Sequence, residues 1–381
     1  MNEREHLLSH HHFDDDREIT FISSFKHTMC SSKFNWLLVF VPIALIFSHA
    51  SPSVVFTLNF IAIMPLAKLL SFATEEIALR SGSVIGSLLN ATFGNAVELI
   101  LGMIALKEGL VRVVQASILG SILSNLLLVL GCCFLAGGIG CSEQSFNSTA
   151  AQTSTSLLGI TSLSLLIPAA FSATTGRNDL EAENGIINLS HGTAIILLIV
   201  YALYLVFQLK THTELFEDDE PEEEEPSTTL TFSVISLLVI ALFIAVHAEY
   251  LVGAIEGVVD AWGLNETFVG LIILPIVGNA AEHVGAVTFA MKNKMNLCIG
   301  IAVSSSLQIG LLVSPVLVLT GWMIDVPMTF FFELFETVVL FASVLVVNYL
   351  IQDGKSNWLE GSLLLACYAI VAMAFYYHPV V

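Results

Sequence analysis

A long stretch of the chain carries no charged side chain. Between Phe34 and Ala67 there is no Asp, Glu, Lys or Arg. A helical bilayer crossing takes about 20 predominantly apolar residues, so this stretch is long enough for two crossings that meet near His49. Within a bilayer every backbone polar group must be satisfied by the protein itself, which leaves α-helices as the structure for such a segment. The stretch therefore predicts a helical membrane protein.

Further windows with little or no charge follow along the rest of the chain. They run over residues 81–106, 113–142, 144–176, 184–209, 226–248, 267–291, 295–324, 326–352 and 361–381. Two helices precede them, and we extend the second of these to about Arg80. The pattern predicts an all-α polytopic membrane protein with eleven transmembrane helices.

The composition excludes other classes of protein. The chain is 55% hydrophobic and only 12% charged, whereas soluble domains carry roughly 25% charged residues. Its formal net charge of −20 would repel nucleic-acid phosphates, so we expect no nucleic-acid partner. The six cysteines include no C-x-x-C spacing, and we expect neither a disulfide framework nor a zinc site.

The charges outside the windows predict the orientation of the chain. Residues 1–33 are polar, and we expect a disordered cytosolic tail before a first transmembrane helix at residues 34–50. Nine Lys and Arg residues then lie on the side of the N-terminus, and three lie on the opposite side. By the positive-inside rule the N-terminus is cytosolic, and the C-terminus is lumenal or extracellular.

A run of nine acidic residues between positions 214 and 225 separates two sets of five windows. We expect a first five-helix repeat over residues 51–209, an acidic cytosolic linker or helix over residues 210–228, and a second five-helix repeat over residues 229–381. The linker is either a solvated connection or a segment that attracts or senses cations, which includes a regulatory Ca²⁺.

Each half contains a copy of one motif. Residues 94–98 read Gly-Asn-Ala-Val-Glu, and residues 278–282, which lie 184 positions later, read Gly-Asn-Ala-Ala-Glu. Because five helices is an odd number, the two copies must insert with opposite topology. The chain therefore predicts one extra N-terminal helix plus two inverted five-helix repeats, an arrangement typical of secondary transporters. We expect interrupted helices at Gly94, Gly278 and Pro275.

The repeat also predicts a cation site. Glu98 and Glu282 are the single charges of their windows, and a carboxylate at the centre of a membrane costs about 2.5–3.5 kcal/mol unless it faces the protein interior. Asn95 and Asn279 precede them by three residues, on the same helical face. With one residue deleted, Ser121 and Asn125 match Ser304 and Gln308. Such an all-oxygen set suits a hard cation such as Ca²⁺.

The two carboxylates bind protons as well as cations. Without a cation, two glutamates buried close together cannot both stay ionised, because desolvation and like-charge repulsion oppose it. Cation binding and protonation therefore exclude each other, which predicts antiport. The alternatives are a Na⁺/Ca²⁺ exchanger, a passive Ca²⁺ channel, and an intramembrane enzyme that uses the carboxylates as acid and base.

The two motifs resemble the signature repeats of the CAX-type Ca²⁺/H⁺ antiporters, within the calcium/cation exchanger superfamily. The resemblance rests on residues 90–98, Asn-Ala-Thr-Phe-Gly-Asn-Ala-Val-Glu, and residues 277–283, Val-Gly-Asn-Ala-Ala-Glu-His, and it extends over almost all of residues 34–377. Fungal vacuolar members are the most similar. This implies a transporter of the vacuolar membrane, not an enzyme, that has Ca²⁺ and H⁺ as substrates and no cofactor.

The resemblance also implies roles for single residues. Glu98 and Glu282 would be the central Ca²⁺/H⁺ carboxylates. The residues near them would be Asn95, Asn279, Ser121, Asn125, Ser304 and Gln308. Glu75 and Glu249 match acidic family positions on flanking gating helices, where they would relay protons or steady one access state; the alternative is a structural hydrogen bond between helices. The oligomeric state stays open.

Overall fold

The computed structural model describes residues 19–174, 180–213 and 225–378, and this part of the chain is helical apart from two short strands. The helices are α1 Phe21–Cys30, α2 Phe40–Ile46, α3 Pro52–Ser81, α4 Ser83–Phe93, α5 Ala96–Lys107, α6 Val111–Leu123, α7 Leu130–Gly138, α8 Ser148–Thr174, α9 Leu180–Val206, α10 Leu230–Gly253, α11 Ile255–Trp262, α12 Glu266–Phe268, α13 Leu274–Met291, α14 Met295–Gln308, α15 Ser314–Met323, α16 Leu334–Leu350 and α17 Trp358–Tyr377. A 3₁₀ segment, Lys33–Val39, precedes α2. The π-helical segments are Ser124–Val129, Phe207–Thr211, Val269–Ile273 and Ile309–Val313.

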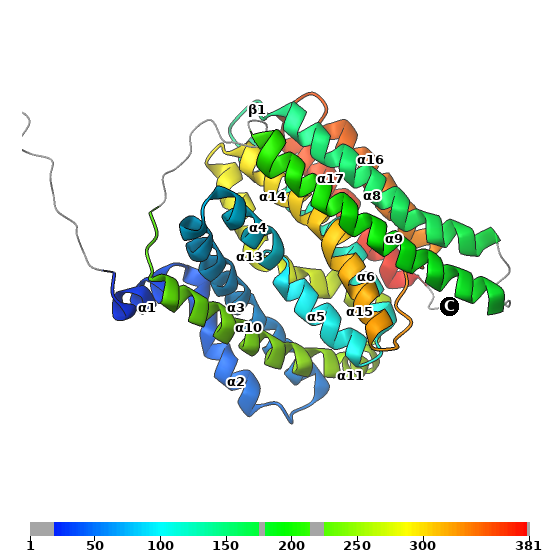
Figure 1. Ribbon diagram of the computed structural model, residues 1–381, viewed down its shortest axis with the longest axis horizontal. Coiled ribbons are helices and arrows are strands. Elements are labelled where there is room, and N and C mark those ends of the chain that lie inside the picture. The colour runs from blue at the N-terminus through cyan, green and yellow to red at the C-terminus, as the bar shows by residue number, and fades with distance from the viewer. Residues whose placement is uncertain (1–18, 175–179, 214–224, 379–381) are drawn as a thin grey trace, which may run out of the picture.

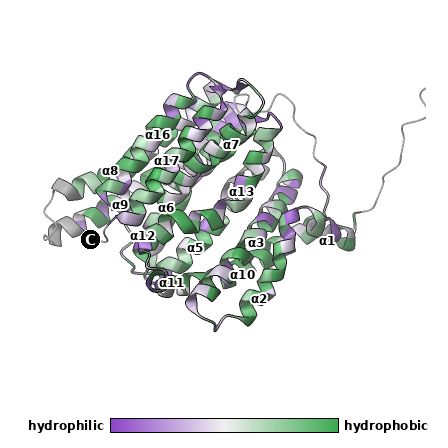
Figure 2. Cartoon of the chain, turned by 180° about the vertical axis from the view of Figure 1, so that it is seen from behind, coloured by the Kyte–Doolittle hydropathy of each residue, from purple (hydrophilic) through white to green (hydrophobic). Residues whose placement is uncertain are grey.

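The described helices confirm the predicted class, an all-helical membrane protein. Seven helices are long and apolar enough to cross a membrane, or up to nine if each of two sharply bent pairs is one span. The 17-residue α16 is shorter, and the window 81–106 is divided between α4 and α5. The number eleven and the inverted arrangement of two repeats therefore stay predictions. Figure 2 shows that apolar residues cover much of the helix surfaces.

The helices form two groups with three helices between them. α2, α3, α10 and α11 lie together on one side of the molecule, whereas α6, α8, α9 and α14 to α17 lie on the other (Figure 1). α4, α5 and α13 lie between the two groups. α3 packs along α10, and Asn59 Oδ1 lies 2.6 Å from His247 Nδ1 at a fully buried contact between them. The middle three helices carry the two signature motifs.

A second polar contact joins α3 to the start of α10. Glu76, buried on α3, accepts hydrogen bonds from the backbone N–H of Ser227 at 3.0 Å and of Thr228 at 2.9 Å, and from both hydroxyl groups. The next residue, Thr229, donates its N–H to Ser24 Oγ of α1 at 3.0 Å. One buried carboxylate thus fixes the point where the second half of the chain begins.

α1 lies inside the segment predicted to be a disordered tail. Its apolar side chains point outward, with Phe21, Ile22 and Phe25 exposed by 56%, 81% and 55%, while Ser24 and Thr28 are buried against the protein. The helix turns by 97° before the apolar segment Lys33–Ile46. The prediction of disorder is therefore wrong for these residues, and residues 1–18 of the tail lie outside the described residues.

Two loops from different halves pair as a small sheet. β1, Gln144–Ser145, runs antiparallel to β2, Lys355–Ser356. Lys355 Nζ lies 2.7 Å from Glu143 Oε2 in an exposed ion pair, and this carboxylate raises the pKa of the Lys355 ammonium group. The sheet joins the two halves at one end of the helix bundle.

The helix that carries the motif is interrupted at the motif in the first half of the chain but not in the second half. The helix breaks between α4 and α5 at Asn95, which departs from helical dihedral angles (φ −104°, ψ 25°), whereas Gly94, where the sequence predicts the break, keeps them (φ −56°, ψ −41°). α13 in contrast runs unbroken through Gly278, so the predicted interruption there is wrong. The helix runs without a gap from Glu266 into α13, and Pro275 follows the π-helical segment Val269–Ile273, where its missing N–H removes one helical donor without ending the helix.

Candidate cation site

The carboxylate of one motif lies against the glycine of the other. A Cβ atom added at Gly278 on α13 would lie 2.7 Å from Glu98 Oε1 and 3.0 Å from Glu98 Cδ. The Glu98 carboxylate is also within electrostatic range of Glu282. Two segments that are 184 residues apart in the sequence therefore meet between the two groups of helices.

The break before α5 favours a negative charge at Glu98. Asn95 is the N-cap residue of α5, and Glu98 lies in the first turn of that helix. The free N–H groups of a helix N-terminus and the helix dipole stabilise a carboxylate in this position. The interruption at Asn95 thus supplies positive potential in the interior, where a lone carboxylate is costly.

Several buried polar atoms of the two motifs have no hydrogen-bond partner among the described residues. They are Asn95 Oδ1, Glu98 Oε2, and both Nδ2 and Oδ1 of Asn279, and the amide Nδ2 of Asn125 is in the same situation. Unpaired buried polar atoms cost about 1–3 kcal/mol each. The oxygens among them, one carboxylate and two amide oxygens, are the ligand type that Ca²⁺ prefers. The donor set therefore fits a hard cation.

Asn95 and Gln308 link the first motif to the second half. Asn95 Nδ2 donates to Gln308 Oε1 at 2.5 Å, and the same glutamine oxygen lies 3.8 Å from a Cβ added at Gly94. Gln308 is the last residue of α14, directly before the π-helical segment Ile309–Val313. The sequence prediction that Asn95 and Gln308 lie near one site agrees with this contact.

Glu282 is paired with a serine that the sequence argument missed. Ser305 Oγ donates to Glu282 Oε2 at 2.8 Å, while the predicted Ser304 lines the same cavity. Ser305 follows Glu282 by 23 residues, and Ser121 follows Glu98 by 23 residues. The offset of 184 that relates the motifs therefore also relates Ser121 to Ser305. The one-residue deletion assumed in the sequence alignment moved the match to the neighbouring serine.

A cavity of about 680 Å³ leads to Glu282. Its polar lining residues include Lys68, Ser71, Thr74, Glu75, Asn90, Ser304, Ser305 and Gln308, and it extends to Asn147, Gln208 and Asn296 near the ends of three helices. Glu98 and Ser121 line a second cavity of about 20 Å³, together with Gly278 and Pro275. The large cavity thus reaches one carboxylate, whereas the other borders a space about the size of one water molecule.

The two predicted gating glutamates lie in different surroundings. Glu75 on α3 lines the large cavity and accepts a hydrogen bond from Ser71 Oγ at 3.2 Å. Glu249 is exposed on α10 and lines neither of the two cavities described above. The structure therefore brings Glu75, but not Glu249, to the path towards Glu282. Asn125 is buried in the π-helical segment Ser124–Val129.

The structure describes only the two ends of the predicted acidic linker, and Ser227 and Thr228 of its second end bind Glu76. Residues 214–224 lie outside the described residues, and so does the regulatory Ca²⁺ that the sequence leaves open there. Within residues 19–174, 180–213 and 225–378, no three His, Cys, Asp or Glu side chains form a group that could hold a metal ion. Any cation site of the described residues therefore needs neutral oxygens beside its carboxylates.

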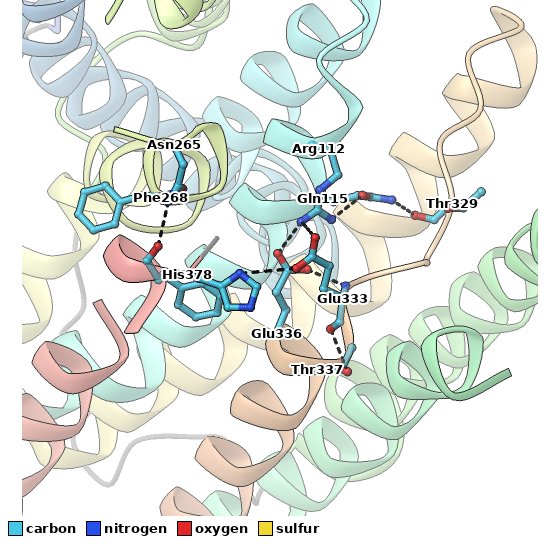
Figure 3. A network of polar contacts seen from close by, with 10 residues as sticks. Arg112, Gln115, Asn265, Phe268, Thr329, Glu333, Glu336, Thr337 and His378 are labelled. Atoms are coloured by element: carbon cyan, nitrogen blue, oxygen red, sulfur yellow. Dashed lines mark hydrogen bonds and ion pairs between the residues drawn. The ribbon is translucent and has the colours of Figure 1, made fainter. Parts of the chain in front are cut away.

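Glu333 and Glu336, which the sequence places at the start of the tenth window, belong to a separate polar network (Figure 3). They form a capping box at the start of α16. Arg112 Nη2, at the start of α6, lies 2.8 Å from Glu336 Oε1 and 3.4 Å from Glu333 Oε1. Gln115 of α6 donates to the backbone carbonyl of Thr329 at 2.9 Å. The network ties α6 to α16, so these glutamates act in helix packing.

Comparisons with known proteins agree with this architecture. A Ca²⁺/H⁺ antiporter protein named YfkE has a solved structure that matches with a TM-score of 0.77 and 37% identity, covering 91% of this chain and 99% of that one. A structure described as the H⁺/Ca²⁺ exchanger CAX matches with a TM-score of 0.71, 16% identity, and coverage of 95% and 90%. The second likeness concerns the fold alone.

Curated relatives are similar over nearly the whole chain. The vacuolar calcium ion transporter of Schizosaccharomyces pombe is 51% identical over 360 residues, covering 93% of this chain and 87% of the relative. The Ca²⁺/H⁺ antiporter of Aphanothece halophytica is 46% identical over 365 residues, with coverage of 91% and 97%. The family model described as sodium/calcium exchanger protein matches residues 51–210 and 232–377. The chain therefore belongs to the sodium/calcium exchanger protein family.

Proposed function

We propose that this protein is a secondary active Ca²⁺/H⁺ antiporter, which moves cytosolic Ca²⁺ into an acidic compartment in exchange for protons. The observation that carries the proposal is the meeting of the two motifs, where Glu98 contacts Gly278 within electrostatic range of Glu282. Relatives at 51% and 46% identity are named a vacuolar calcium ion transporter and a Ca²⁺/H⁺ antiporter. The first name supports Ca²⁺ transport at a vacuolar membrane, and the second supports the exchange of Ca²⁺ for H⁺.

The proposed site holds Ca²⁺ between the two halves. Glu98 and Glu282 supply the negative charge, and Asn95, Asn279, Ser121, Asn125, Ser304 and Gln308 surround them as neutral polar groups. Ser305 orients the Glu282 carboxylate through its 2.8 Å hydrogen bond. Ca²⁺ takes 6–8 oxygen ligands, so carboxylates, amides and hydroxyls must act together. Removing the cation leaves two close carboxylates that then take up protons.

This exclusivity couples the two fluxes. The loaded site is close to neutral with either one Ca²⁺ or two protons, whereas the empty site carries two negative charges that are costly to move within the membrane. Each pH unit of gradient supplies about 1.36 kcal/mol per proton transported. We assign the two cavities to alternating access: the large cavity admits ions to Glu282, and the small cavity beside Glu98 is closed.

The membrane topology is part of the proposal. We place one extra N-terminal helix and two inverted five-helix repeats in the membrane as eleven spans, with a cytosolic N-terminus and a lumenal C-terminus. Asn147, Gln208 and Asn296, which line the outer part of the large cavity, lie next to loops that this topology makes cytosolic. The described conformation then faces the cytosol. Glu75 lies on the ion path from that side, and Glu249 serves the opposite access state.

The test is Ca²⁺ uptake by proteoliposomes with an acid interior and no sodium. Wild type is expected to take up Ca²⁺ only while the pH gradient lasts and to release protons as it does so. Glu98→Gln and Glu282→Gln keep the side-chain size but remove the charge, and each is expected to reduce uptake at least about 100-fold, as a charge lost from a buried site does. Glu256→Gln, at an exposed position on α11, is the matched control.

Three results would contradict the proposal. Uptake driven by a sodium gradient instead of a pH gradient would indicate a Na⁺/Ca²⁺ exchanger. Uptake that follows membrane potential alone, without proton release, would indicate a channel. Full activity of both glutamine variants would show that the two carboxylates are not the transport site.

A further inference from the structure

An intramembrane lysine lines the cavity that leads to Glu282. Lys68 is the seventeenth of the 30 residues of α3, and it lies on the same helical face as Ser71 and Glu75, which also line the cavity. A lysine near the middle of a membrane helix costs about 2.5–3.5 kcal/mol on insertion scales unless it faces a polar interior or water. Its position towards the cavity removes this cost.

The charge of Lys68 acts on the proposed site. Among the described residues, the charged side chains that line the large cavity are Lys68, Glu75 and Glu282. The Lys68 ammonium group interacts electrostatically with the Glu282 carboxylate. The influence of Lys68 on this carboxylate is smaller than that of burial and of the hydrogen bond from Ser305. A positive charge on the path of a cation opposes binding of that cation in proportion to its valence.

We propose that Lys68 is a specificity-determining residue, a fixed cation inside the cavity that weakens Ca²⁺ binding at Glu282 and thereby sets the Ca²⁺ concentration at which the protein works. This inference rests on the proposed antiport function. Two buried carboxylates with amide oxygens would otherwise hold Ca²⁺ tightly, and tight binding slows release. The repulsion lowers the affinity for a divalent cation more than that for a monovalent cation, because the energy scales with charge.

Lys68 lies on a different helix from Glu282 and from the serine that orients Glu282. Lys68 belongs to the group of helices α2, α3, α10 and α11, whereas Glu282 belongs to α13 (Figure 1). Ser305, which orients Glu282, lies on α14 and is independent of α3. A change at Lys68 therefore alters the electrostatics of the site while the hydrogen bond that positions Glu282 remains.

The experiment compares Lys68→Met with wild type, using purified protein. Ca²⁺ binding is measured by isothermal titration calorimetry, and the KM for Ca²⁺ is measured in proteoliposomes at one fixed pH. Lys68→Met removes the charge and keeps the length of the side chain. We expect both the Kd and the KM for Ca²⁺ to fall by about three- to tenfold, as for a unit charge acting through a water-filled cavity.

Two further variants separate charge from structure. Lys68→Arg keeps the charge and is expected to bind Ca²⁺ within about twofold of wild type. Lys292→Met removes an exposed lysine directly after α13 and controls for a general change in net charge. A Kd of Lys68→Met equal to that of wild type would overturn the inference. So would an equal loss of maximal rate in Lys68→Met and Lys68→Arg with an unchanged KM, since this indicates a structural role.

The outcome for wild type distinguishes the two proposals. If wild type exchanges Ca²⁺ for protons but Lys68→Met has an unaltered Kd, the antiport function stands and the role of Lys68 fails. If wild type neither binds nor transports Ca²⁺, the proposed function fails, and the role of Lys68 fails with it.

Discussion

At the residue scale, the contact between Glu98 and Gly278 decides which side chains the site tolerates. A Cβ atom at position 278 would lie 2.7 Å from a carboxylate oxygen and 3.0 Å from the carboxylate carbon, so any larger residue there forces the end of the Glu98 side chain to shift. α13 is continuous at this contact, and Glu98 lies in the first turn of α5, which begins two residues earlier at Ala96. The glycine therefore defines the position of the carboxylate.

We predict that Gly278→Ala displaces the Glu98 carboxylate. The added methyl group overpacks a buried contact, a change that typically costs about 1–3 kcal/mol. Ca²⁺ uptake is expected to fall at least about tenfold, with a Tm within a few degrees of wild type. Gly159→Ala on α8 is the control, because a Cβ atom there meets nothing within 4 Å. Wild-type uptake by Gly278→Ala would show that the contact has no role in transport.

The sequence predicted the chemistry of the site better than its register. Glu98, Glu282 and Asn95 follow from a five-residue repeat with a fixed offset, and the Glu98 carboxylate lies against Gly278 of the second copy. The choice of Ser304 over Ser305 depended on where a one-residue gap was placed, and helical spacing alone cannot decide between neighbouring residues. The hydrogen bond between Ser305 and Glu282 resolves that choice. The sequence argument did not identify Lys68, which has no counterpart in the repeated motif.

At the element scale, polar contacts fix the position of α3 relative to α10, which hydrophobic packing alone would not determine. Glu76 receives four hydrogen bonds from two residues at the start of α10, and His247 contacts Asn59 farther along the same pair of helices. In a membrane the apolar surface of a helix gains little by leaving lipid, so polar contacts and close packing decide which helices stay together. α3 and α10 are therefore one packing unit.

We predict that Glu76→Gln weakens this junction. The amide keeps one acceptor oxygen but loses the charge that the two backbone N–H groups and two hydroxyl groups satisfy. Losing charge-assisted hydrogen bonds of this kind costs about 1.5–3 kcal/mol. The Tm in detergent is expected to fall by several degrees, whereas Glu108→Gln, exposed at the end of α5, leaves it unchanged. Equal Tm values for both variants would contradict a structural role of Glu76.

Helix boundaries show what the sequence cannot supply at this scale. The predicted break near Gly94 lies one residue later, at Asn95, and the break predicted at Gly278 does not form, because glycine permits a break but surrounding packing decides whether and where one forms. α1 was missed because its ten residues carry polar side chains on the face towards the protein and apolar side chains on the outer face. That pattern is the reverse of the pattern in a soluble amphipathic helix. A short polar segment before the first transmembrane helix is therefore easily taken for a disordered tail.

At the scale of the whole molecule, proton and Ca²⁺ binding must oppose each other from the side that the large cavity faces. A cation ligand must be deprotonated to bind, so Ca²⁺ affinity falls as the pH falls. We predict that acidifying the solution on the cytosolic side raises the KM for Ca²⁺, by up to about tenfold per pH unit for each proton displaced. Acidifying the opposite side instead increases the rate, because it steepens the driving gradient.

The measurement is initial Ca²⁺ uptake at several external pH values with the pH difference across the membrane held constant. A KM that rises as both sides become more acidic supports competition at one site. A KM independent of pH would show that protons and Ca²⁺ bind at separate sites, and the exchange would then need another form of coupling. Glu98→Gln is the control in a binding assay, since one titrating group fewer lowers the pH dependence.

The overall class of the molecule was the most predictable property. Uncharged windows of bilayer length leave few structures other than helices, and the described residues are helical apart from β1 and β2. The number of transmembrane helices is harder to predict, because α16 is short and α4 and α5 share one uncharged window. The pairing of β1 with β2 was not predictable, since two strands of two residues each leave no periodic pattern.

The Glu98–Gly278 contact also limits which pairs of residues can occupy positions 98 and 278. A carboxylate belonging to one half occupies space that a missing side chain leaves in the other half. The reciprocal position differs, because Gly94 faces Asn90 and Gln308. The two copies of the motif are therefore not equivalent in their contacts, and a larger residue at position 278 requires a shorter or displaced side chain at position 98. A chimaera that joins halves from relatives with different residues at these positions inherits a mismatch at the centre of its ion path.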